Sequence, residues 1–298
     1  MVHIPVLTKE ILKYLEVKPN ENFIDATVGE SGHTLEILKK NGPKGCVLAI
    51  DLDPKQVENS RLHTAHFKER VMLVNDSYIN IKDIIRRENF KLVDGILLDL
   101  GMSSWQLEES KRGFSFKRNE VLDMRYSMEN VLTAEKIVNE YPEYEIEKIL
   151  RDYGEEKFAG KIARKISEIR KTKRIQSTFE LKEAIQDALP PKFRSGKIHV
   201  ATRTFQALRI AVNGELDNLK EFLPQAIEVL SSGGRLAIIS FHSLEDRMVK
   251  NFFKNKLQQG LVKILTKKPI TASYAEVLKN PRSRSAKLRA IIKINPKS

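Results

Sequence analysis

The sequence predicts an α/β fold, in which a mostly parallel sheet is interrupted by an inserted helical segment. The first observation is an alternation of short apolar segments with helical patterns, at 22–26, 46–50, 71–74 and 93–98. The second is the shortness of the connections, because repeated β-α units of this kind build a parallel sheet that helices cover on both faces. The third is a long stretch, 108–210, with helical patterns and almost no strand signal.

Start and stop signals justify the helices of the first part. A helix is predicted at 8–17, where the apolar residues fall on one face. The helix that opens near His33 is closed by Gly42 and Pro43, and Pro54 occupies the first position of the next helix.

The inserted segment has three clear helical signals. A helix at 142–153 is closed by Gly154, and Ser177 with Glu180 forms a capping box ahead of another helix. Between them, four apolar residues at helical spacing form a buried stripe: Phe158, Ile162, Ile166 and Ile169.

The α/β alternation returns after the insertion. A helix from Glu215 leads to a strand at 235–241, and Ser243 with Asp246 reads as the capping box of the following helix. The last two strands, 262–265 and 288–294, have no helix between them and are expected to pair antiparallel. We therefore expect an α/β domain made of 1–107 and 211–298, and a helical insertion at 108–210 that recognises the substrate.

Charge and composition narrow the class of partner. The 298 residues have a formal net charge of +13, and this excess of Lys and Arg favours an anionic partner, above all a nucleic acid. A merely basic surface is the alternative. No apolar run is long enough for a membrane span, and no signal pattern opens the chain, so a cytoplasmic protein without a membrane partner is expected. Cys46 is the only cysteine, which excludes a disulfide framework.

The stretch FIDATVGESGHT, residues 23–34, has the order strand, glycine turn, helix. The strand stops on Asp25, and the turn contains Gly29 and Gly32. Such a turn is typical of a nucleotide or nucleotide-like cofactor site, although an ordinary β-α turn has the same look. Asp51 ends the second strand about twenty residues later, where a carboxylate can accept both hydroxyls of a ribose. Turn, spacing and acid together favour cofactor binding.

The glycine pattern also bears on which cofactor binds. A dinucleotide site has G-x-G-x-x-G, whereas here Glu30 and Ser31 separate Gly29 from Gly32, which argues against NAD. An uncharged turn suits a cationic cofactor without phosphate, and S-adenosylmethionine has that character. Asp99 ends the fourth strand and is expected in the same crevice, as a contact to the cofactor, as a contact to a substrate amine, or as a local backbone cap.

Other chemistries find less support. No pair among the six histidines and the one cysteine has convincing zinc spacing, so no metal site is predicted. Ser240, His242 and Ser243 lack the nucleophile-elbow pattern. Three basic clusters, at 164–165, 170–174 and 282–289, add to the case for RNA or DNA, although each alone reads as a solvated face.

Several motifs in order along the chain resemble one known family. They include DATVGESGHT, AIDLDP, DGILLDLGMSSWQL, RGFSF, LDMR, YGEE, ATRTFQALRIAVNGEL, SFHSLEDR and RSRSAKLRA. Together they resemble the MraW family of ribosomal RNA small subunit methyltransferases. The resemblance implies a class I, Rossmann-like methyltransferase fold, with a mostly parallel seven-stranded sheet, an antiparallel last strand and a helical insertion.

The resemblance also implies an activity and a set of positions. The activity is methylation of the exocyclic N4 of a cytosine in the decoding region of 16S rRNA, within the small ribosomal subunit, from S-adenosylmethionine. The implied cofactor positions are Ser31, Gly32, His33, Asp51, Tyr78, Asp99 and Gln106. Ser31 stands where the family commonly has glycine, and its hydroxyl is expected near the amino-acid end of the cofactor. Tyr78 stands where phenylalanine is common, and Tyr126, Val121 and Val200 also depart from the family pattern.

The RNA side and the proton acceptor remain hypotheses. Arginines in the RGFSF, LDMR, ATRTFQALR and RSRS motifs are expected to hold phosphates: Arg112, Arg125, Arg203, Arg282 and Arg284. Phe114 or Phe116 is expected to stack on a base, although each can equally belong to the core. Asp99, or a backbone carbonyl at 100–103, is the candidate acceptor of the N4 proton. A non-enzymatic ribosome-assembly factor and an NAD-dependent oxidoreductase are the competing functions.

Overall fold

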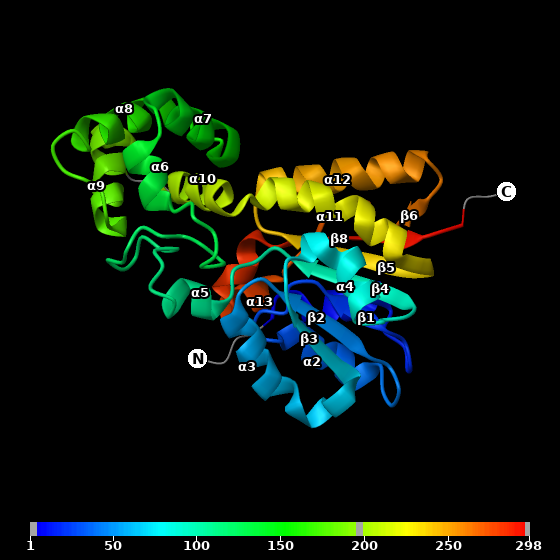
Figure 1. The fold of residues 1–298 in the computed structure, drawn as a ribbon. Coiled ribbons are helices and arrows are strands. Elements are labelled where there is room, and N and C mark those ends of the chain that lie inside the picture. The colour runs from blue at the N-terminus through cyan, green and yellow to red at the C-terminus, as the bar shows by residue number, and fades with distance from the viewer. Residues whose placement is uncertain (1–4, 195–198, 296–298) are drawn as a thin grey trace. The chain divides into compact units, whose positions relative to one another are not determined.

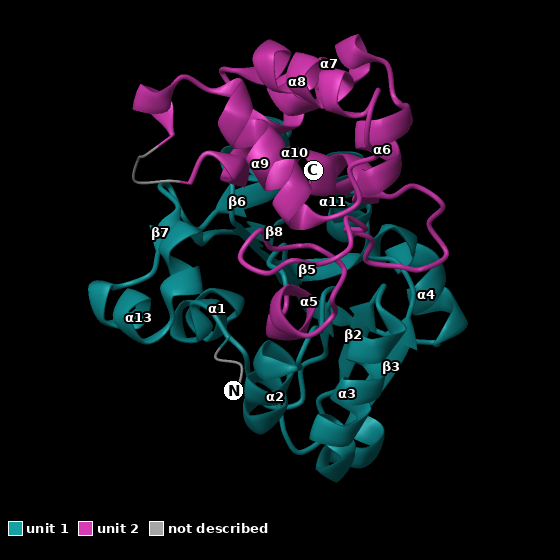
Figure 2. Ribbon diagram, turned by 90° about the vertical axis from the view of Figure 1, so that its left-hand side faces the viewer, with its two compact units in different colours: residues 1–102, 216–298 teal, residues 103–215 magenta. Residues whose placement is uncertain are grey.

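The structure is a computed structural model that describes residues 5–194 and 199–295. The chain divides into two compact units, one made of Met1–Met102 with Leu216–Ser298 and the other of Ser103–Glu215 (Figure 2). The chain passes between the units at 102/103 and 215/216, each five residues from the boundaries predicted at 107/108 and 210/211. The difference at the first crossing arises because Ser103 already caps a helix of the second unit.

The first unit contains one sheet (Figure 1). Its strands are β1 (Phe23–Asp25), β2 (Val47–Asp51), β3 (Val71–Asn75), β4 (Val93–Asp99), β5 (Leu230–Ser240), β6 (Val262–Ile264), β7 (Ile270–Thr271) and β8 (Lys287–Lys293). The order is β3-β2-β1-β4-β5-β8-β6, and β7 also pairs with β8. Strands β1 to β5 are parallel, whereas β8 runs antiparallel to β5, β6 and β7.

This topology confirms the predicted α/β class and the antiparallel last strand. All seven predicted strands are present, and β7 is an eighth with only two residues. Strand β5 begins five residues earlier than predicted, because Leu230 pairs with Val93 and the register then shifts before Gly95. The strand order reverses between β1 and β4, and ligands of open α/β sheets bind outside the carboxyl ends of the strands at such a point.

Helices pack on both faces of this sheet. They are α1 (Thr8–Leu15), α2 (Gly32–Lys40), α3 (Pro54–Thr64), α4 (Ile81–Arg87), α11 (Glu215–Val229), α12 (Ser243–Gln258) and α13 (Tyr274–Lys279), with 3-10 turns at Ala65–Arg70, Tyr78–Asn80 and Pro281–Ser285. Helices α1 and α2 bury Ile11, Leu15 and Ile37 against one face. Helices α4, α11 and α12 cover the other face, where Phe222 is fully buried.

The second unit is helical. Its elements are α5 (Ser104–Glu108), α6 (Ala134–Glu140), α7 (Glu143–Gly154), α8 (Ala159–Ile169), α9 (Thr178–Ala188), a 3-10 turn (Pro191–Phe193) and α10 (Ala201–Asn213). Ile162 and Ile166 of the predicted stripe are fully buried, whereas Phe158 and Ile169 at its ends are only half-buried. The Ser177–Glu180 capping box is confirmed. A Cβ at Gly154 would lie 2.8 Å from the Arg203 carbonyl oxygen, so glycine permits the close packing of α7 on α10.

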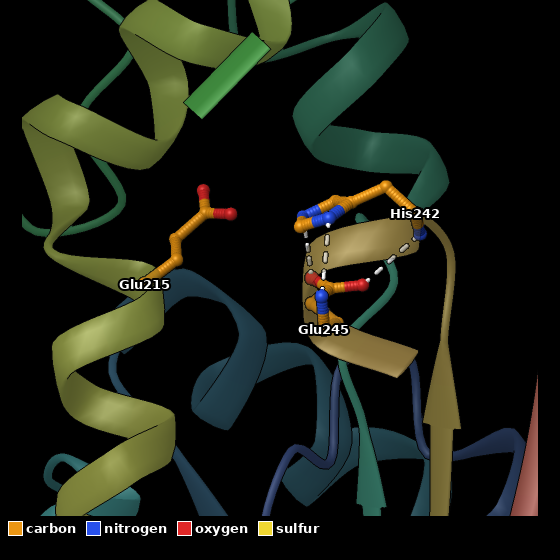
Figure 3. A group of neighbouring side chains, drawn as sticks. All are labelled: Glu215, His242 and Glu245. Carbon is orange, nitrogen blue, oxygen red and sulfur yellow. Dashed lines mark hydrogen bonds and ion pairs between the residues drawn. The ribbon is translucent and has the colours of Figure 1, made fainter. Parts of the chain in front are cut away.

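The cap of α12 differs from the prediction. His242 is the N-cap residue: its Nδ1 accepts the Glu245 N–H at 3.4 Å, and the Glu245 carboxylate accepts the His242 N–H at 3.2 Å (Figure 3). Asp246 instead pairs with Arg289 of β8 at 2.6 Å. The predicted capping box of Ser243 and Asp246 is therefore wrong by one residue, and the box consists of His242 and Glu245. The reason is that β5 ends at Ser240, one residue before the predicted end at 241. Within the described ranges, no helix combines the length and apolarity needed to cross a membrane.

Candidate cofactor site

Three adjacent strands of the first unit end on aspartates. Asp25 ends β1, Asp51 ends β2 and Asp99 ends β4. Because these strands are parallel neighbours in the order β2-β1-β4, their carboxyl ends lie at the same edge of the sheet. The structure therefore brings together the two predicted acids, Asp51 and Asp99, on either side of β1.

The glycine turn after β1 is held by Asp51. Gly29 has φ +47°, in the left-handed region, and its N–H donates to the Asp51 carboxylate at 2.9 Å. The Asp53 N–H donates to the other oxygen of the same carboxylate at 2.9 Å. Gly32 has a different reason to be glycine, because a Cβ there would lie 2.9 Å from the Pro5 ring.

The carboxyl group of Asp51 has a strongly raised pKa. Burial raises its pKa to about 7, and the nearby Asp53 and Asp25 act in the same direction. The N–H groups of Asp53 and Gly29 oppose this rise without cancelling it. A carboxylate has roughly four acceptor positions, and two backbone donors leave capacity for further hydroxyl donors.

Ser31 adopts φ +67°, which explains why glycine is favourable at this position. Its side chain is fully buried, and its hydroxyl donates to Ser60 of α3 at 2.6 Å. Ser60 in turn donates to the Gly29 carbonyl oxygen at 2.9 Å. The hydroxyl expected to lie near a cofactor is thus already used to fasten the turn to α3, and contact of Ser31 with a ligand would involve its backbone.

Asp25 has an internal role. It is 1% exposed, and its carboxylate accepts the Thr34 hydroxyl at 2.7 Å and the Thr27 N–H at 3.3 Å. Burial raises its pKa, while the Thr34 hydrogen bond and the neighbouring His33 lower it. Asp25 thereby ties the end of β1 to the first turn of α2.

His33 and Asp99 form the second focus of the site. His33 is 7% exposed, and its Nε2 lies 3.5 Å from the Asp99 carboxylate. Among the described residues, neither ring nitrogen of His33 has a hydrogen-bond partner. The other Asp99 oxygen accepts the Gly101 N–H at 2.9 Å. A Cβ at Gly101 would lie 2.8 Å from the Phe241 ring, which accounts for glycine in this tight turn.

Tyr78 follows β3 at the same edge of the sheet. Its ring meets Phe222 edge-on, with centroids 5.2 Å apart and planes at 83°. The Asn75 amide donates to the carbonyl oxygens of Asp51 and Leu52 at 2.9 and 3.1 Å, which fixes the end of β3 to the end of β2. Tyr78 is therefore carried by a segment fastened to the Asp51 backbone.

Gln106 belongs to the other unit. It is buried and completes a capping box at α5, where its side-chain oxygen accepts the Ser103 N–H at 3.0 Å and the Ser103 hydroxyl accepts the Gln106 N–H at 3.1 Å. Six of the seven predicted cofactor residues thus belong to the first unit, and the cofactor role of all seven stays a prediction from the resemblance.

Two of the predicted RNA-binding arginines have guanidinium groups engaged within the second unit. Arg112 donates to the carbonyl oxygens of Arg125 and Tyr126 at 3.2 and 2.9 Å. Arg125 pairs with Asp123 at 2.8 Å and donates to the Asn130 carbonyl oxygen at 2.7 Å. Although burial favours the neutral acid, the hydrogen bonds from Arg125 hold the pKa of Asp123 below its usual value.

The two phenylalanines differ in burial. Phe114 is buried and stacks on Tyr126 at 5.4 Å, as a core residue does. Phe116 is half-buried and stacks on His199 at 4.6 Å. Among the remaining predicted arginines, Arg203 of α10 and Arg284 of the Pro281–Ser285 turn are exposed, and Arg282 is half-buried.

Sequence reasoning missed the residues that hold the turn from outside it. Ser60 lies outside every recognised motif, and its hydrogen bonds with Ser31 and with the Gly29 carbonyl oxygen depend on helix α3 being in place. Thr34 ends the FIDATVGESGHT stretch, but its hydrogen bond to Asp25 was not anticipated. The one signal in the sequence that could have pointed to such residues is a polar residue on the apolar, core-facing side of a predicted helix. Gln56 and Ser60, both fully buried on α3, fit that description.

Comparison with known proteins identifies relatives along the whole chain. A model of the MraW methylase family matches residues 1–294. The ribosomal RNA small subunit methyltransferase H of Persephonella marina is 46% identical over 292 residues, covering 98% of this chain and 99% of that protein. Its counterpart in Kosmotoga olearia is 47% identical over 295 residues, covering 98% and 97%. A crystal structure from Clostridium thermocellum, described as a provisional rRNA methylase, aligns with a TM-score of 0.50 at 14% identity, over 98% of this chain and all of that one, which concerns the fold alone.

Proposed function

Because the chain belongs to the MraW methylase family, we propose that it methylates the exocyclic N4 of one cytosine in the decoding region of 16S rRNA, with S-adenosylmethionine as the cofactor. The substrate is the RNA within the small ribosomal subunit, and the protein acts in the cytoplasm. One observation supports the proposal above others: Asp51 and Asp99 end the strands on either side of β1, where the strand order reverses.

The residues at this edge fit such a cofactor. Asp51 has acceptor capacity beyond its two backbone donors, and burial leaves its charge poorly solvated, so two ribose hydroxyls would improve its environment. The turn at Gly29 presents backbone and no cationic side chain, which suits a ligand that is itself positively charged. When bound, the cofactor supplies an electrophilic methyl group.

The task of the protein is then orientation. The N4 lone pair of cytosine is delocalised into the ring, so the amine must be held in line with the methyl group at short range. Positioning of this kind lowers barriers by as much as about 7–11 kcal/mol in favourable cases. The Asp99 carboxylate would accept one N4–H, turn the lone pair toward the methyl group, and take the proton that the nitrogen loses as the new C–N bond replaces the methyl–sulfur bond. The target base must leave its stack to reach this site.

Methyl transfer to small subunits tests the proposal. Purified protein is given cofactor labelled in the methyl group and small subunits that lack the modification, and the digested RNA is analysed by nucleoside mass spectrometry. Label at N4 of one cytosine is expected. Label at carbon 5 or on a ribose would refute the assignment of the target atom.

Two variants separate cofactor binding from methyl transfer. Asp51→Asn keeps one acceptor oxygen for the turn but removes the charge, and should weaken cofactor binding in calorimetry. Asp99→Asn should lower methyl transfer more than cofactor affinity. Asp94→Asn is the matched control, because Asp94 lies in β4 near its start and accepts the Asn22 N–H at 2.8 Å. If Asp94→Asn and Asp99→Asn lower the rate equally, Asp99 has no specific role.

A further inference from the structure

Two phenylalanine rings meet on the surface of the helical unit. Phe158 precedes α8, and Phe193 ends the 3-10 turn after α9. Their ring centroids are 5.0 Å apart and their planes are inclined by 52°. Phe193 is 43% exposed, although a ring of this size gains more by burial. Together with Lys161 and Lys192, these residues are called the Phe158–Phe193 patch.

Each ring of the patch has a lysine over it. The Lys161 ammonium lies 5.9 Å from the centroid of Phe158, and that of Lys192 lies 5.1 Å from the centroid of Phe193. Both lysines are exposed. Arg164 continues the row one turn along α8, with its side chain 74% exposed and 3.9 Å from Glu143. The patch therefore combines apolar ring faces with mobile positive charges.

Acidic side chains do little to neutralise it. Glu156, the acidic residue nearest to Phe158 in the sequence, is 8% exposed and accepts the Phe158 N–H at 2.9 Å, so its carboxylate is turned into the unit. Glu155 is exposed at the end of α7. No Asp or Glu occurs between 188 and 214, which includes Lys192 and Phe193. From 157 to 174 the chain has eight Lys or Arg and a single acid, Glu168.

We propose that the Phe158–Phe193 patch binds a single-stranded segment of the RNA substrate. A base stacks on the exposed Phe193 ring, and Lys161 and Lys192 neutralise adjacent phosphates. Exposed aromatic rings with lysines around them are the chemistry that binds unpaired RNA, because every base has a face that stacks and every linkage has a charge. This inference rests on the proposed function, and it adds a contact apart from Arg112 and Arg125, whose guanidinium groups are engaged inside the unit.

Binding of naked RNA without cofactor tests the patch directly. The probe is a fluorescent single-stranded fragment of 16S rRNA that includes the decoding region. Phe193→Ala should weaken binding about tenfold, since one stacked base is lost, whereas Phe193→Trp should bind as well as the wild type. Phe179→Ala is the matched control. Phe179 is 36% exposed and has a lysine, Lys182, 5.2 Å from its ring centroid, but no other aromatic ring of the described residues packs against it.

The salt dependence of RNA binding distinguishes a phosphate contact from a purely structural role of the lysines, because only a phosphate contact changes it. Lys161→Gln and Lys192→Gln should each reduce the slope of log affinity against log salt by about 1, while Lys182→Gln should leave it unchanged. Circular dichroism and thermal melting establish that each variant is folded.

The outcomes divide cleanly. Equal loss of affinity in Phe193→Ala and Phe179→Ala, or no loss in either, overturns the proposal. So does a Phe193→Ala variant that binds naked RNA normally but small subunits poorly, because the partner would then be a ribosomal protein. If the wild-type protein methylates N4 and the patch variants bind RNA normally, the proposal that the patch binds RNA is refuted and the proposed function is retained. RNA binding that depends on the patch without any methyl transfer supports the patch and refutes the proposed function.

Discussion

The raised pKa of Asp51 predicts that ligand binding at the glycine turn depends on pH near neutrality. Burial holds this pKa at about 7 in the free protein. Ribose hydroxyls donate to the ionised carboxylate and favour it, so binding must lower the pKa and release a proton. Affinity is therefore expected to increase as the pH rises through 7 and to level off above it.

The size of the effect follows from the free-protein value. With a pKa of about 7 in the free protein and a much lower pKa in the complex, the dissociation constant should fall by up to roughly tenfold between pH 6 and pH 8, which corresponds to about 1.4 kcal/mol. At pH 7 about half a proton should leave the protein for each ligand bound.

The assay requires a ligand with no titration of its own in this range. The amino group of S-adenosylmethionine titrates near pH 8, as α-amino groups do. Methylthioadenosine retains the adenine and the ribose without that amino acid, and is the better probe. Calorimetry in two buffers of different ionisation enthalpy measures both the affinity and the proton release.

Asp51→Asn and Asp94→Asn make the comparison specific. The first variant has no carboxyl group to titrate at the turn, so its weaker affinity should be the same at pH 6 and pH 8. The second should keep the wild-type pH dependence. A flat wild-type profile, or an equal slope in Asp51→Asn, would refute the assignment of the titration to Asp51.

Three further predictions concern stability. Ser60→Ala leaves the buried Ser31 hydroxyl without its acceptor and should lower the free energy of unfolding by about 1–3 kcal/mol in urea titrations; an unchanged midpoint would contradict this. Asp51→Asn should melt higher than the wild type at pH 8 and more nearly equal to it at pH 5, because a folded-state pKa raised to about 7 makes the ionised carboxylate costly as the pH rises. Glu245→Ala should cost about 1–2 kcal/mol through the lost cap of α12 and Ser243→Ala less, and the reverse ranking would restore the Ser243 box.

The fold was predictable where local pattern and tertiary structure agree. Strands β1, β2 and β4 are apolar runs that the sheet buries on both faces, and the edge strand β3 is a half-buried apolar run, so all four have a strong local signal. The start of β5 was not predictable, because Leu230 is added to the strand only by its pairing with Val93 across a register shift. Strand β7 has two residues, Ile270 and Thr271, which is too short for any periodicity to register.

The candidate site was predictable for similar reasons. Acids at the carboxyl ends of parallel strands share one edge of the sheet, so the placement of Asp51 and Asp99 at the same edge followed from the strand boundaries. Their role toward a cofactor stays a prediction. The partners of side chains did not follow. Arg112 and Arg125 are residues of the type that binds phosphate, but their guanidinium groups donate to loop carbonyl oxygens and to Asp123. The conformation of the loop determines these partners. Sequence supplies the charge of an arginine and leaves its partner to the tertiary structure.

Ser31 combines a backbone conformation that favours glycine with a side-chain hydrogen bond that depends on the tertiary structure. Its φ of +67° disfavours any residue with a Cβ, by roughly 1–2 kcal/mol, so glycine is the less strained choice there. The serine hydroxyl, however, donates to Ser60, and Ser60 donates to the Gly29 carbonyl oxygen, so the strained residue takes part in the hydrogen bonds that hold the turn. Those hydrogen bonds offset the strain, and they do so only in a chain that has a small hydroxyl-bearing residue at 60. The departure at Ser31 is therefore best understood as one half of a pair with Ser60. Its effect falls on the rigidity of the turn, while the carboxylate of Asp51 remains the group that we propose binds the ribose.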